Sequence, residues 1–293
     1  MGIVRLFRQI PDIHFTENEN MSAKTSLGVG GNAKYYACPE SAHAAIECIA
    51  LAEKFKVPYK IVGNGTNLLV SDAGFDGLIV CTKNLNGVLL DKGEIIALCG
   101  TPLNKFVHFV SGAGRTGAEG LIGIPATVGG ALAMNAGAFG YSVSDYLYEI
   151  TSVVNGEIVR RKKDECGFNY RTSVFKASGE FIISAKFRFP KRKTAVKDDF
   201  CAKRWETQPS GRTCGSVFEN PAGDFAGRLI ESAGLKGAAV GGAQVSEKHA
   251  NFIIAKDGAK ARDVFSLIAK IKRTVFRKFG VRLKEEVEYL GEF

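Results

Sequence analysis

Apolar residues recur with helical spacing in two long segments of the chain. In residues 41–56, four of them fall on one side of a predicted helix that Ser41 can cap: Ala45, Ile49, Ala52 and Phe55. In the second segment, six keep a period of about 3.6 residues: Val264, Leu267, Ile268, Ile271, Val275 and Phe279. Lysines and arginines occupy the opposite face, which we interpret as solvated, and Gly280 is placed to end this helix.

Short apolar runs between turn residues predict strands. They cover residues 59–62, 78–81, 94–99, 147–154, 157–160 and 180–189, with a last strand over residues 281–290. A further helix is predicted over residues 102–112. Residues 190–199 are charged and poor in apolar side chains, so they are a candidate linker to a second unit over residues 200–282.

The composition is that of an ordinary folded protein. Of 293 residues, 45% are hydrophobic and 24% are charged, which is enough to build a packed core. The seven cysteines include no C-x-x-C pair, so we expect free thiols in a reducing cytosol rather than disulfides or a metal site. No apolar run reaches the roughly 18 residues of a membrane span, and no signal peptide is recognisable. We therefore expect a cytoplasmic protein without a membrane partner.

The net charge of +9 has two interpretations. One is a nucleic-acid-binding surface. The other is a basic pocket for small anions together with solvated lysine and arginine faces. The basic residues are spread along the chain and are not interleaved with an aromatic platform, which favours the second interpretation. A substrate that carries a diphosphate and a carboxylate would be attracted by such a field.

The first glycine motif is Gly63-Asn64-Gly65-Thr66-Asn67, directly after a predicted strand. Glycine lets successive backbone N–H groups converge on an anion, and Thr66 and Asn67 add side-chain donors. The motif therefore predicts a pyrophosphate cradle. A tight turn with Asn-Gly chemistry is an equally good interpretation.

A second, longer glycine-rich stretch covers residues 112–140, where nine residues are glycine. Its central part, EGLIGIPATVGGALAMNAG over residues 119–137, can bring much backbone close to a large planar ligand. The alternative is a turn region that packs closely against a helix. Residues 112–117 match G-x-G-x-x-G, but a helix precedes them and more glycine loop follows, so we reject a dinucleotide-binding fingerprint there.

Three other motifs carry candidate catalytic groups, and each also has a simpler interpretation. Arg171 follows Tyr170 in FNYRTS and could hold a carboxylate or only stack on the ring. Ser216 in GSVFENP could give a proton or only form a turn, and Glu286 in LKEEV could be a solvated carboxylate. A hydrolase is disfavoured, because there is no G-x-S-x-G elbow. In addition, none of the four histidines shows the pattern of a catalytic triad: His14, His43, His108 and His249.

Six motifs occur in one order along the chain: GNGTNLLV, EGLIGIPATVGGALAMNAGAFG, FNYRTS, GSVFENP, AGLKGAAVGGAQVSEKHANFI and FGVRLKEEV. This series closely resembles the UDP-N-acetylenolpyruvoylglucosamine reductase family, in its shorter type, from about Asn20 to Glu292. The resemblance implies an α+β chain with an FAD-binding fold of the vanillyl-alcohol-oxidase (PCMH) type and a C-terminal α/β substrate-binding domain. The implied domains are FAD-binding subdomain 1 over residues 1–62, joined by the C-terminal strand 283–293, FAD-binding subdomain 2 over residues 63–190, and the substrate-binding domain over residues 200–282.

The resemblance also implies an enzyme that uses NADPH and FAD to reduce UDP-N-acetylglucosamine enolpyruvate to UDP-N-acetylmuramate, for peptidoglycan synthesis. Arg171 would stabilise charge that builds on the substrate carboxylate, Ser216 would give a proton, and Glu286 would act in its acid form. The implied FAD-binding residues are Gly63, Asn64, Gly65, Thr66, Asn67, Gly123, Ile124, Pro125, Thr127, Gly129, Gly130, Asn135 and Gly137. The implied substrate-binding residues are Tyr170, Asn220, Lys236 and His249. We expect a monomer without a nucleic-acid partner.

The sequence departs from the family pattern at three places. Ala126 replaces a glycine of G-I-P-G-T, Glu219 replaces a common lysine, and Lys284-Glu285 stands where Glu-Pro is common. None is a catalytic position, so they bear on affinity. Two alternatives stay open: a flavin oxidase or dehydrogenase of the same fold that acts on another alcohol or sugar, and a nucleic-acid-binding module, which only the net charge suggests.

Overall fold

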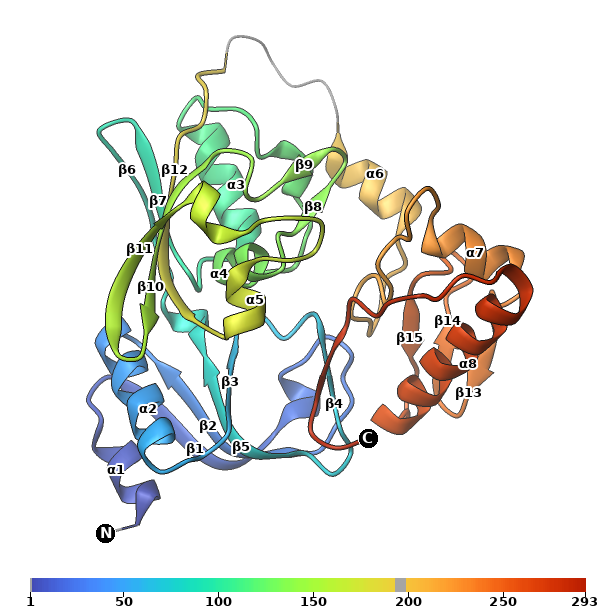
Figure 1. Cartoon of the computed structure of the whole chain (residues 1–293), viewed down its shortest axis with the longest axis horizontal. Helices are drawn as coiled ribbons and strands as arrows, with labels where there is room; N and C mark the ends of the chain where they lie inside the picture. The colour runs from blue at the N-terminus through green and yellow to red at the C-terminus, as the bar shows by residue number, and fades with distance from the viewer. Residues whose placement is uncertain (1, 193–198) are drawn as a thin grey trace. The chain divides into compact units, whose positions relative to one another are not determined.

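The computed structural model describes residues 2–192 and 199–293, which form two compact units (Figure 1). Unit 1 comprises Met1–Glu17, Tyr35–Asn64 and Gly77–Ala202, and unit 2 comprises Asn18–Lys34, Gly65–Asp76 and Lys203–Phe293. The division into three domains that the sequence suggested stays a prediction. Most of the candidate linker, residues 193–198, lies outside the described residues.

A four-stranded sheet holds the N-terminal strands. Its order is β1 (Ile13–Asn20), β2 (Asn32–Pro39), β5 (Phe75–Cys81) and β3 (Tyr59–Val62), and the nearby helices are α1 (Ile3–Gln9) and α2 (Ala42–Lys54). The helix predicted over residues 41–56 is confirmed as α2. Ser41 caps it, because its Oγ accepts the N–H of Ala44 at 3.1 Å. Ile49 and Ala52 are buried as predicted, whereas Phe55 follows the helix and is exposed.

The larger sheet of unit 1 is antiparallel throughout. Its order is β11 (Glu157–Lys162), β10 (Leu147–Val154), β12 (Phe181–Phe187), β7 (Glu94–Leu98) and β6 (Val88–Asp91). The strands predicted over residues 94–99, 147–154, 157–160 and 180–189 are therefore confirmed. In the core, Phe106 packs on Phe187 with ring centroids 4.8 Å apart.

Short elements complete this region. The predicted helix over residues 102–112 is confirmed as α3 (Leu103–Gly112), so the G-x-G-x-x-G at residues 112–117 follows a helix and not a strand. The other elements are α4 (Val128–Ala133), α5 (Val174–Ser178), α6 (Phe200–Thr207), the hairpin of β8 (Gly137–Ala138) and β9 (Tyr141–Ser142), and the 3-10 helices η2 (Thr82–Asn84), η3 (Glu119–Leu121) and η4 (Lys163–Cys166).

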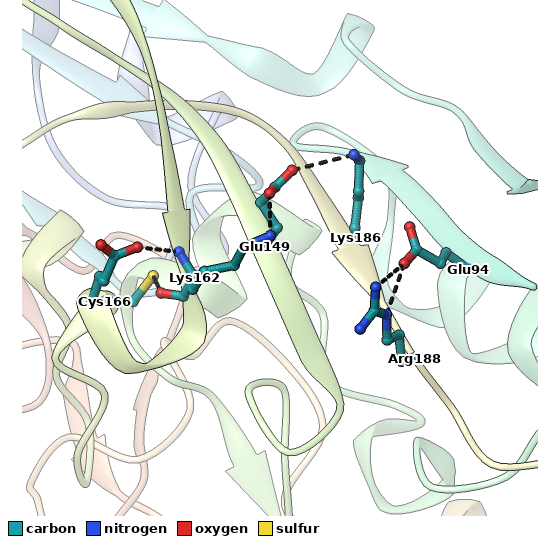
Figure 2. A network of polar contacts seen from close by, with 7 residues as sticks. Glu94, Glu149, Lys162, Cys166, Lys186 and Arg188 are labelled. Carbon is teal, nitrogen blue, oxygen red and sulfur yellow. Dashed lines mark hydrogen bonds and ion pairs between the residues drawn. The ribbon is translucent and has the colours of Figure 1, made fainter.

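A network of charged side chains crosses the larger sheet (Figure 2). Glu149 on β10 is buried and pairs with Lys162 on β11 at 2.6 Å and with Lys186 on β12 at 3.2 Å. The hydrogen bond from Lys162 lowers the pKa of Glu149. Beyond it, Arg188 pairs with Glu94 at 2.7 Å. A slip of one residue would move Glu149 to the other face of the sheet, so the network fixes the strand register.

Unit 2 combines small sheets with two helices. Strands β13 (Ala239–Val240), β14 (Ala243–Val245) and β15 (Ile253–Ala255) form an antiparallel sheet that packs against α8 (Ala261–Phe279), drawn in red in Figure 1. Helix α7 (Ala226–Ser232) also contacts α8. Strand β4 (Leu68–Val70) pairs in parallel with β16 (Glu288–Leu290), and η1 (Met21–Ala23) is a 3-10 helix.

Helix α8 confirms the second periodic segment. Five of the six predicted residues lie on its buried face, namely Val264, Leu267, Ile268, Ile271 and Val275. The sixth, Phe279, is half-buried. Gly280 ends the helix in the left-handed conformation, with φ of 70°. Among the described residues, no helix combines the length and the apolar content that crossing a membrane requires.

The last predicted strand, over residues 281–290, is too long. Only residues 288–290 form strand, as β16. This strand pairs with β4 in a separate two-stranded sheet and does not join the four-stranded sheet that contains β1, β2 and β3. Residues 285–287 pair irregularly instead, because the N–H groups of Glu286 and Val287 both point at the carbonyl oxygen of Val217, at 2.8 and 3.4 Å. Two consecutive donors on one acceptor break the alternation that a regular ladder needs.

Two carboxylates close the N-terminal end of α8. Asp72 accepts the N–H groups of Ala261 at 2.8 Å and Arg262 at 2.9 Å. Asp263 accepts the N–H groups of Lys260 and Gly242, both at 3.0 Å. The hydrogen bonds from the Lys260 and Gly242 backbone lower the pKa of Asp263. These contacts satisfy N–H groups near the start of the helix and suit its dipole.

We predict that Ile268→Ala lowers the free energy of unfolding by about 2–5 kcal/mol, because it removes buried methyl groups and leaves a cavity. Ile268 is 1% exposed. Arg273→Ala, on the exposed side of α8, is the matched control and should change stability by less than about 0.5 kcal/mol. Urea unfolding followed by circular dichroism measures both; equal effects would contradict the burial of this face.

Asp263→Asn should destabilise the protein at neutral pH and hardly at all at about pH 2. The folded-state pKa of Asp263 lies below its ordinary value, so its contribution is present above that value and is lost as the pH falls through the folded pKa. Urea unfolding of the variant and of the parent chain at both pH values gives the difference. Asp257→Asn, on a fully exposed side chain, is the control. A difference that does not shrink in acid would be incompatible with these contacts.

Candidate functional site

Two of the predicted cofactor segments meet in unit 1. Asn64 donates its side-chain N–H to the carbonyl oxygen of Pro125 at 2.7 Å. A Cβ atom at Gly63 would overlap with the hydroxyl of Thr127, so only glycine allows this approach. The structure therefore joins the end of β3 to the glycine-rich stretch, although they are far apart in the sequence.

Many N–H groups of the glycine-rich stretch are already used inside the protein. Gly123 donates to the side chain of Asn104 at 2.7 Å, Gly129 donates to the carbonyl oxygen of Cys99 at 2.7 Å, and Gly130 donates to Thr127 Oγ1 at 3.3 Å. These glycines therefore serve close packing, which was the alternative interpretation of the stretch. A cofactor contact of these three residues would have to use other atoms.

Asn135 has a different role in the same stretch. Its backbone adopts a left-handed conformation, with φ of 44°, which is uncommon for a residue that is not glycine. Its side-chain N–H bonds to the carbonyl oxygen of Asn169 at 2.9 Å. Its side-chain oxygen is buried and has no hydrogen-bond partner among the described residues. A buried acceptor of this kind suits a donor on a bound ligand, because burial without a partner is costly.

Arg171 lies at the tip of a tight turn. Asn169 and Thr172 exchange backbone hydrogen bonds of 3.2 Å across it, and Arg171 itself has φ of 54°. The guanidinium donates to the carbonyl oxygen of Gly137 at 3.2 Å and lies 5.0 Å from the Tyr170 ring. Backbone strain of this kind is often found at functional positions.

Three hydrogen bonds tie this turn to the glycine-rich stretch. They run from Asn135 to the carbonyl oxygen of Asn169, from Arg171 to that of Gly137, and from the hydroxyl of Ser173 to that of Ala133 at 2.7 Å. The predicted carboxylate-binding arginine is therefore built onto the predicted cofactor loop.

The rest of the first glycine motif belongs to unit 2. Gly65 accepts the N–H of Ser26 at 3.2 Å, and the hydroxyl of Ser26 donates to the carbonyl oxygen of Thr213 at 2.6 Å. Asn67 donates its side-chain N–H to the carbonyl oxygen of Glu286 at 2.9 Å. The motif is thus connected to the segments of two predicted catalytic residues.

Sequence reasoning missed two hydroxyl groups beside these segments. The side-chain oxygens of Thr25 and Thr213 are buried and have no hydrogen-bond partner among the described residues. Thr25 precedes the glycine-rich run Gly28-Val29-Gly30-Gly31, which was a signal that could have drawn attention to it. Thr213 lies three residues before Ser216 and carries no such signal of its own.

The segments that carry Ser216 and Glu286 pair with each other in unit 2. On one side, Ser216 forms an isolated antiparallel β-bridge with Phe252. On the other side, the backbone carbonyl oxygen of Val217 accepts the N–H of Glu286 at 2.8 Å. Burial raises the pKa of the Cys214 thiol to about 12, and the charge of Glu286 acts in the same direction. The proposed proton donor and carboxyl group therefore share one backbone framework, whereas Arg171 belongs to unit 1.

Asn251 stabilises this framework by hydrogen bonds to Val217 and Phe218. It is 4% exposed, and its side chain accepts the N–H of Phe218 at 3.0 Å and donates to the carbonyl oxygen of Phe218 at 2.8 Å. Its backbone carbonyl also accepts the N–H of Val217 at 2.9 Å. Asn251 is a positioning residue that the sequence did not single out.

Three of the predicted substrate residues gather around α7. The side-chain oxygen of Asn220 accepts the N–H of Ala226 at 3.0 Å, and His249 lies beside Gly227. Lys236 pairs with Glu231 at 2.8 Å. The fourth, Tyr170, is exposed and belongs to unit 1.

The protonation of His249 follows from its surroundings. Burial lowers the pKa of His249, and the nearby charge of Lys236 acts in the same direction. Its Nδ1 accepts the N–H of Asn251 at 3.2 Å. The neutral ring therefore carries its proton on Nε2, which can act as a donor.

Two departures from the family pattern face each other. Lys284 pairs with Glu219 at 2.9 Å, and the backbone N–H of Glu219 donates to the carbonyl oxygen of Lys284 at 2.9 Å. The resemblance implies a lysine at position 219 and a glutamate at position 284, so relative to that pattern the two charges stand in exchanged places in this chain. The two departures pair with each other here. Glu285 pairs with Lys272 of α8 at 2.6 Å.

Comparisons with known proteins agree over most of the chain. A family model described as FAD binding domain matches residues 33–161, and one described as UDP-N-acetylenolpyruvoylglucosamine reductase, C-terminal domain, matches residues 207–290. Enzymes of that name from Agathobacter rectalis and Listeria monocytogenes are both 38% identical; the matches cover 97% of this chain and 96% and 97% of the relatives.

A solved structure is similar as well. UDP-N-acetylenolpyruvylglucosamine reductase from Thermus caldophilus is 31% identical, with a TM-score of 0.79, over 95% of this chain and 99% of the other. Together with the FAD-binding model, this similarity confirms an α+β chain with an FAD-binding domain and a C-terminal reductase domain. The vanillyl-alcohol-oxidase (PCMH) type of the FAD-binding fold stays a prediction.

Asn251→Leu should lower the free energy of unfolding by about 1–3 kcal/mol for each Phe218 backbone group left buried without a partner. The leucine keeps the volume but cannot make either hydrogen bond. Lys256→Ala, at an exposed position on the same segment, is the control and should be close to neutral. Urea unfolding measures both variants. A leucine variant as stable as the parent chain would show that the Asn251 side chain does not hold the Ser216 segment.

Proposed function

Because the chain belongs to the UDP-N-acetylenolpyruvoylglucosamine reductase family, we propose that it uses NADPH and bound FAD to reduce the enolpyruvyl ether of UDP-N-acetylglucosamine to UDP-N-acetylmuramate. The reaction supplies peptidoglycan precursors and takes place in the cytoplasm, where it serves cell-wall growth, cell shape and division. The observation that carries the proposal is the shared framework of Ser216 and Glu286 in unit 2.

The residues of unit 1 fit an FAD cofactor. The buried side-chain oxygen of Asn135, which has no partner among the described residues, is a feature that packing alone does not require. We propose that these predicted residues of unit 1 hold FAD: Gly63, Asn64, Gly123, Ile124, Pro125, Thr127, Gly129, Gly130, Asn135 and Gly137. The other three predicted residues, Gly65, Thr66 and Asn67, belong to unit 2. When bound, FAD supplies the hydride for the reduction.

Arg171 is proposed to bind the carboxylate of the enolpyruvyl group. Its guanidinium is a permanent planar cation, which stabilises negative charge as it builds on that carboxylate. The strained turn and the hydrogen bond to Gly137 hold the group in place before the substrate arrives. Preorganisation of this kind avoids rearrangement during the reaction.

Ser216 is proposed to give a proton to the carbon next to the carboxylate. A serine hydroxyl is a weak acid, so it needs surroundings that favour loss of the proton. Glu286 would act in its acid form, because a second negative charge beside the developing one would be repelled. Its backbone bond to Val217 keeps the carboxyl group with the segment that carries Ser216.

The residues around α7 are proposed to bind the nucleotide diphosphate part of the substrate. Lys236 and the Nε2 proton of His249 offer a cation and a donor, and Asn220 adds an amide. A bound diphosphate would compete with Glu231 for Lys236. Tyr170 is proposed to assist from the turn that carries Arg171.

The proposal is tested by supplying the purified, FAD-loaded protein with NADPH and UDP-N-acetylglucosamine enolpyruvate. NADPH oxidation should depend on the sugar nucleotide, and mass spectrometry should find a product with two more hydrogen atoms. Turnover of simple alcohols with oxygen, without reduction of the sugar nucleotide, would instead support an oxidase of the same fold.

Ser216→Ala should slow substrate reduction by about 100- to 10,000-fold, the usual contribution of a general acid, and leave the reduction of FAD by NADPH unchanged. Stopped-flow absorbance measures the two half-reactions separately. Ser232→Ala, at an exposed position of α7, is the control and should change neither rate. An equal loss in both half-reactions would mean that Ser216 has a structural role.

A further inference from the structure

The outward side of helix α8 concentrates the positive charge of the chain. Residues 261–282 contain seven lysines and arginines and one acidic residue, so they carry +6 of the net charge of +9. Two of the seven cations are used within the fold. Lys272 pairs with Glu285 at 2.6 Å, and Lys278 donates to the carbonyl oxygen of Ser232 at 2.7 Å. The other five have no ion pair among the described residues: Arg262, Lys270, Arg273, Arg277 and Arg282.

These cations lie along one side of the helix. At about 100° per residue, the four that belong to α8 fall within roughly a quarter of its circumference. Arg262 and Arg273 are eleven residues apart, which is close to three full turns. The row from Arg262 to Arg277 is about 22 Å long at 1.5 Å per residue. Lys270 is partly buried, and the other cations of the row are exposed.

A row of aromatic side chains borders the cations. Phe265 and Phe276 are also eleven residues apart on α8, so they share one edge of the charged row. Phe276 is 42% exposed, and the guanidinium of Arg282 lies 4.6 Å from its ring centre. Phe265 stacks on Phe293, which is also 42% exposed, with ring centroids 5.1 Å apart. This side of the helix therefore offers apolar rings and permanent cations next to each other.

We propose that the exposed side of α8 binds the surface of an anionic lipid bilayer. Clusters of lysine and arginine on a helix attract anionic headgroups, and aromatic rings lie at the boundary between headgroups and acyl chains. The buried face of α8 stays packed in unit 2, so binding requires no rearrangement of the fold. The absence of an apolar run in the sequence excluded a membrane span, but a helix that lies on a surface needs no such run.

Nucleic acid is the other polyanion that a charge of this kind attracts. Proteins that hold single strands place successive aromatic faces along a basic groove, so that bases stack on them. On α8, the ring of Phe276 is paired with Arg282, and the ring of Phe265 is paired with Phe293. The rings therefore stack within the protein and border the cations instead of alternating with them. This arrangement fits a bilayer surface better, and duplex DNA is a comparison in the test.

The surface is tested by sedimenting the purified protein with vesicles of phosphatidylglycerol and phosphatidylcholine at about 0.1 M salt. The protein should bind these vesicles, dissociate as the salt rises, and not bind vesicles of phosphatidylcholine alone. Arg273→Glu combined with Arg277→Glu should weaken binding by at least about 30-fold, since each cation near an anionic surface contributes about a factor of five. Phe276→Ala should also weaken it, without a change in net charge.

The matched control is Lys54→Glu combined with Lys56→Glu, at two exposed lysines of unit 1. Each reversal lowers the net charge by two, so both double variants carry +5 instead of +9. The control should bind nearly as tightly as the parent chain. Equal losses in the two double variants would overturn the proposal. A parent chain that does not bind the anionic vesicles, or that binds duplex DNA more tightly, would overturn it as well.

Circular dichroism checks that the variants fold. If the charge reversal on α8 disturbs the helix, Arg273→Gln combined with Arg277→Gln replaces it and should still weaken binding by about 25-fold, because two cations are lost. Vesicle binding is measured without substrate, so its failure would leave the proposed reduction of the sugar nucleotide untouched.

Discussion

The candidate chemistry of unit 2 depends on one hydrogen-bond acceptor, the backbone carbonyl oxygen of Val217. By accepting the N–H of Glu286, it joins the end of the chain to the segment that carries Ser216. Asn251 locks the neighbouring Phe218 from the other side with both ends of its amide. The irregular pairing that shortens the last strand is therefore the same feature that places the two proposed groups.

In unit 1, a strained turn positions the proposed carboxylate-binding residue, Arg171. Arg171 and Asn135 both adopt left-handed backbone conformations, and each contacts the other's segment by a hydrogen bond. The glycine-rich stretch contributes mainly by close approach, because several of its N–H groups bond within the protein. Glycine here shapes the backbone so that a few polar atoms, such as the Asn135 oxygen, are left available to a ligand.

Sequence periodicity predicted the regular elements well, because burial on one face decides them: α8 and its stop at Gly280 are examples. It failed at residues 281–287, where two N–H groups share one acceptor, since no local pattern encodes a pairing with a distant segment. The same limit explains why Asn251 and Thr213 were missed, and why Glu219 and Lys284 looked like two separate departures until they were found paired. The motif order identified the candidate site residues, but their roles stay predictions.

The most direct test of the central claim is the visible spectrum of the purified protein in the absence of oxygen. The account predicts a yellow protein that NADPH bleaches and whose colour UDP-N-acetylglucosamine enolpyruvate restores. A protein that stays colourless after FAD is added, or a bleached protein whose colour this substrate does not restore, would contradict it.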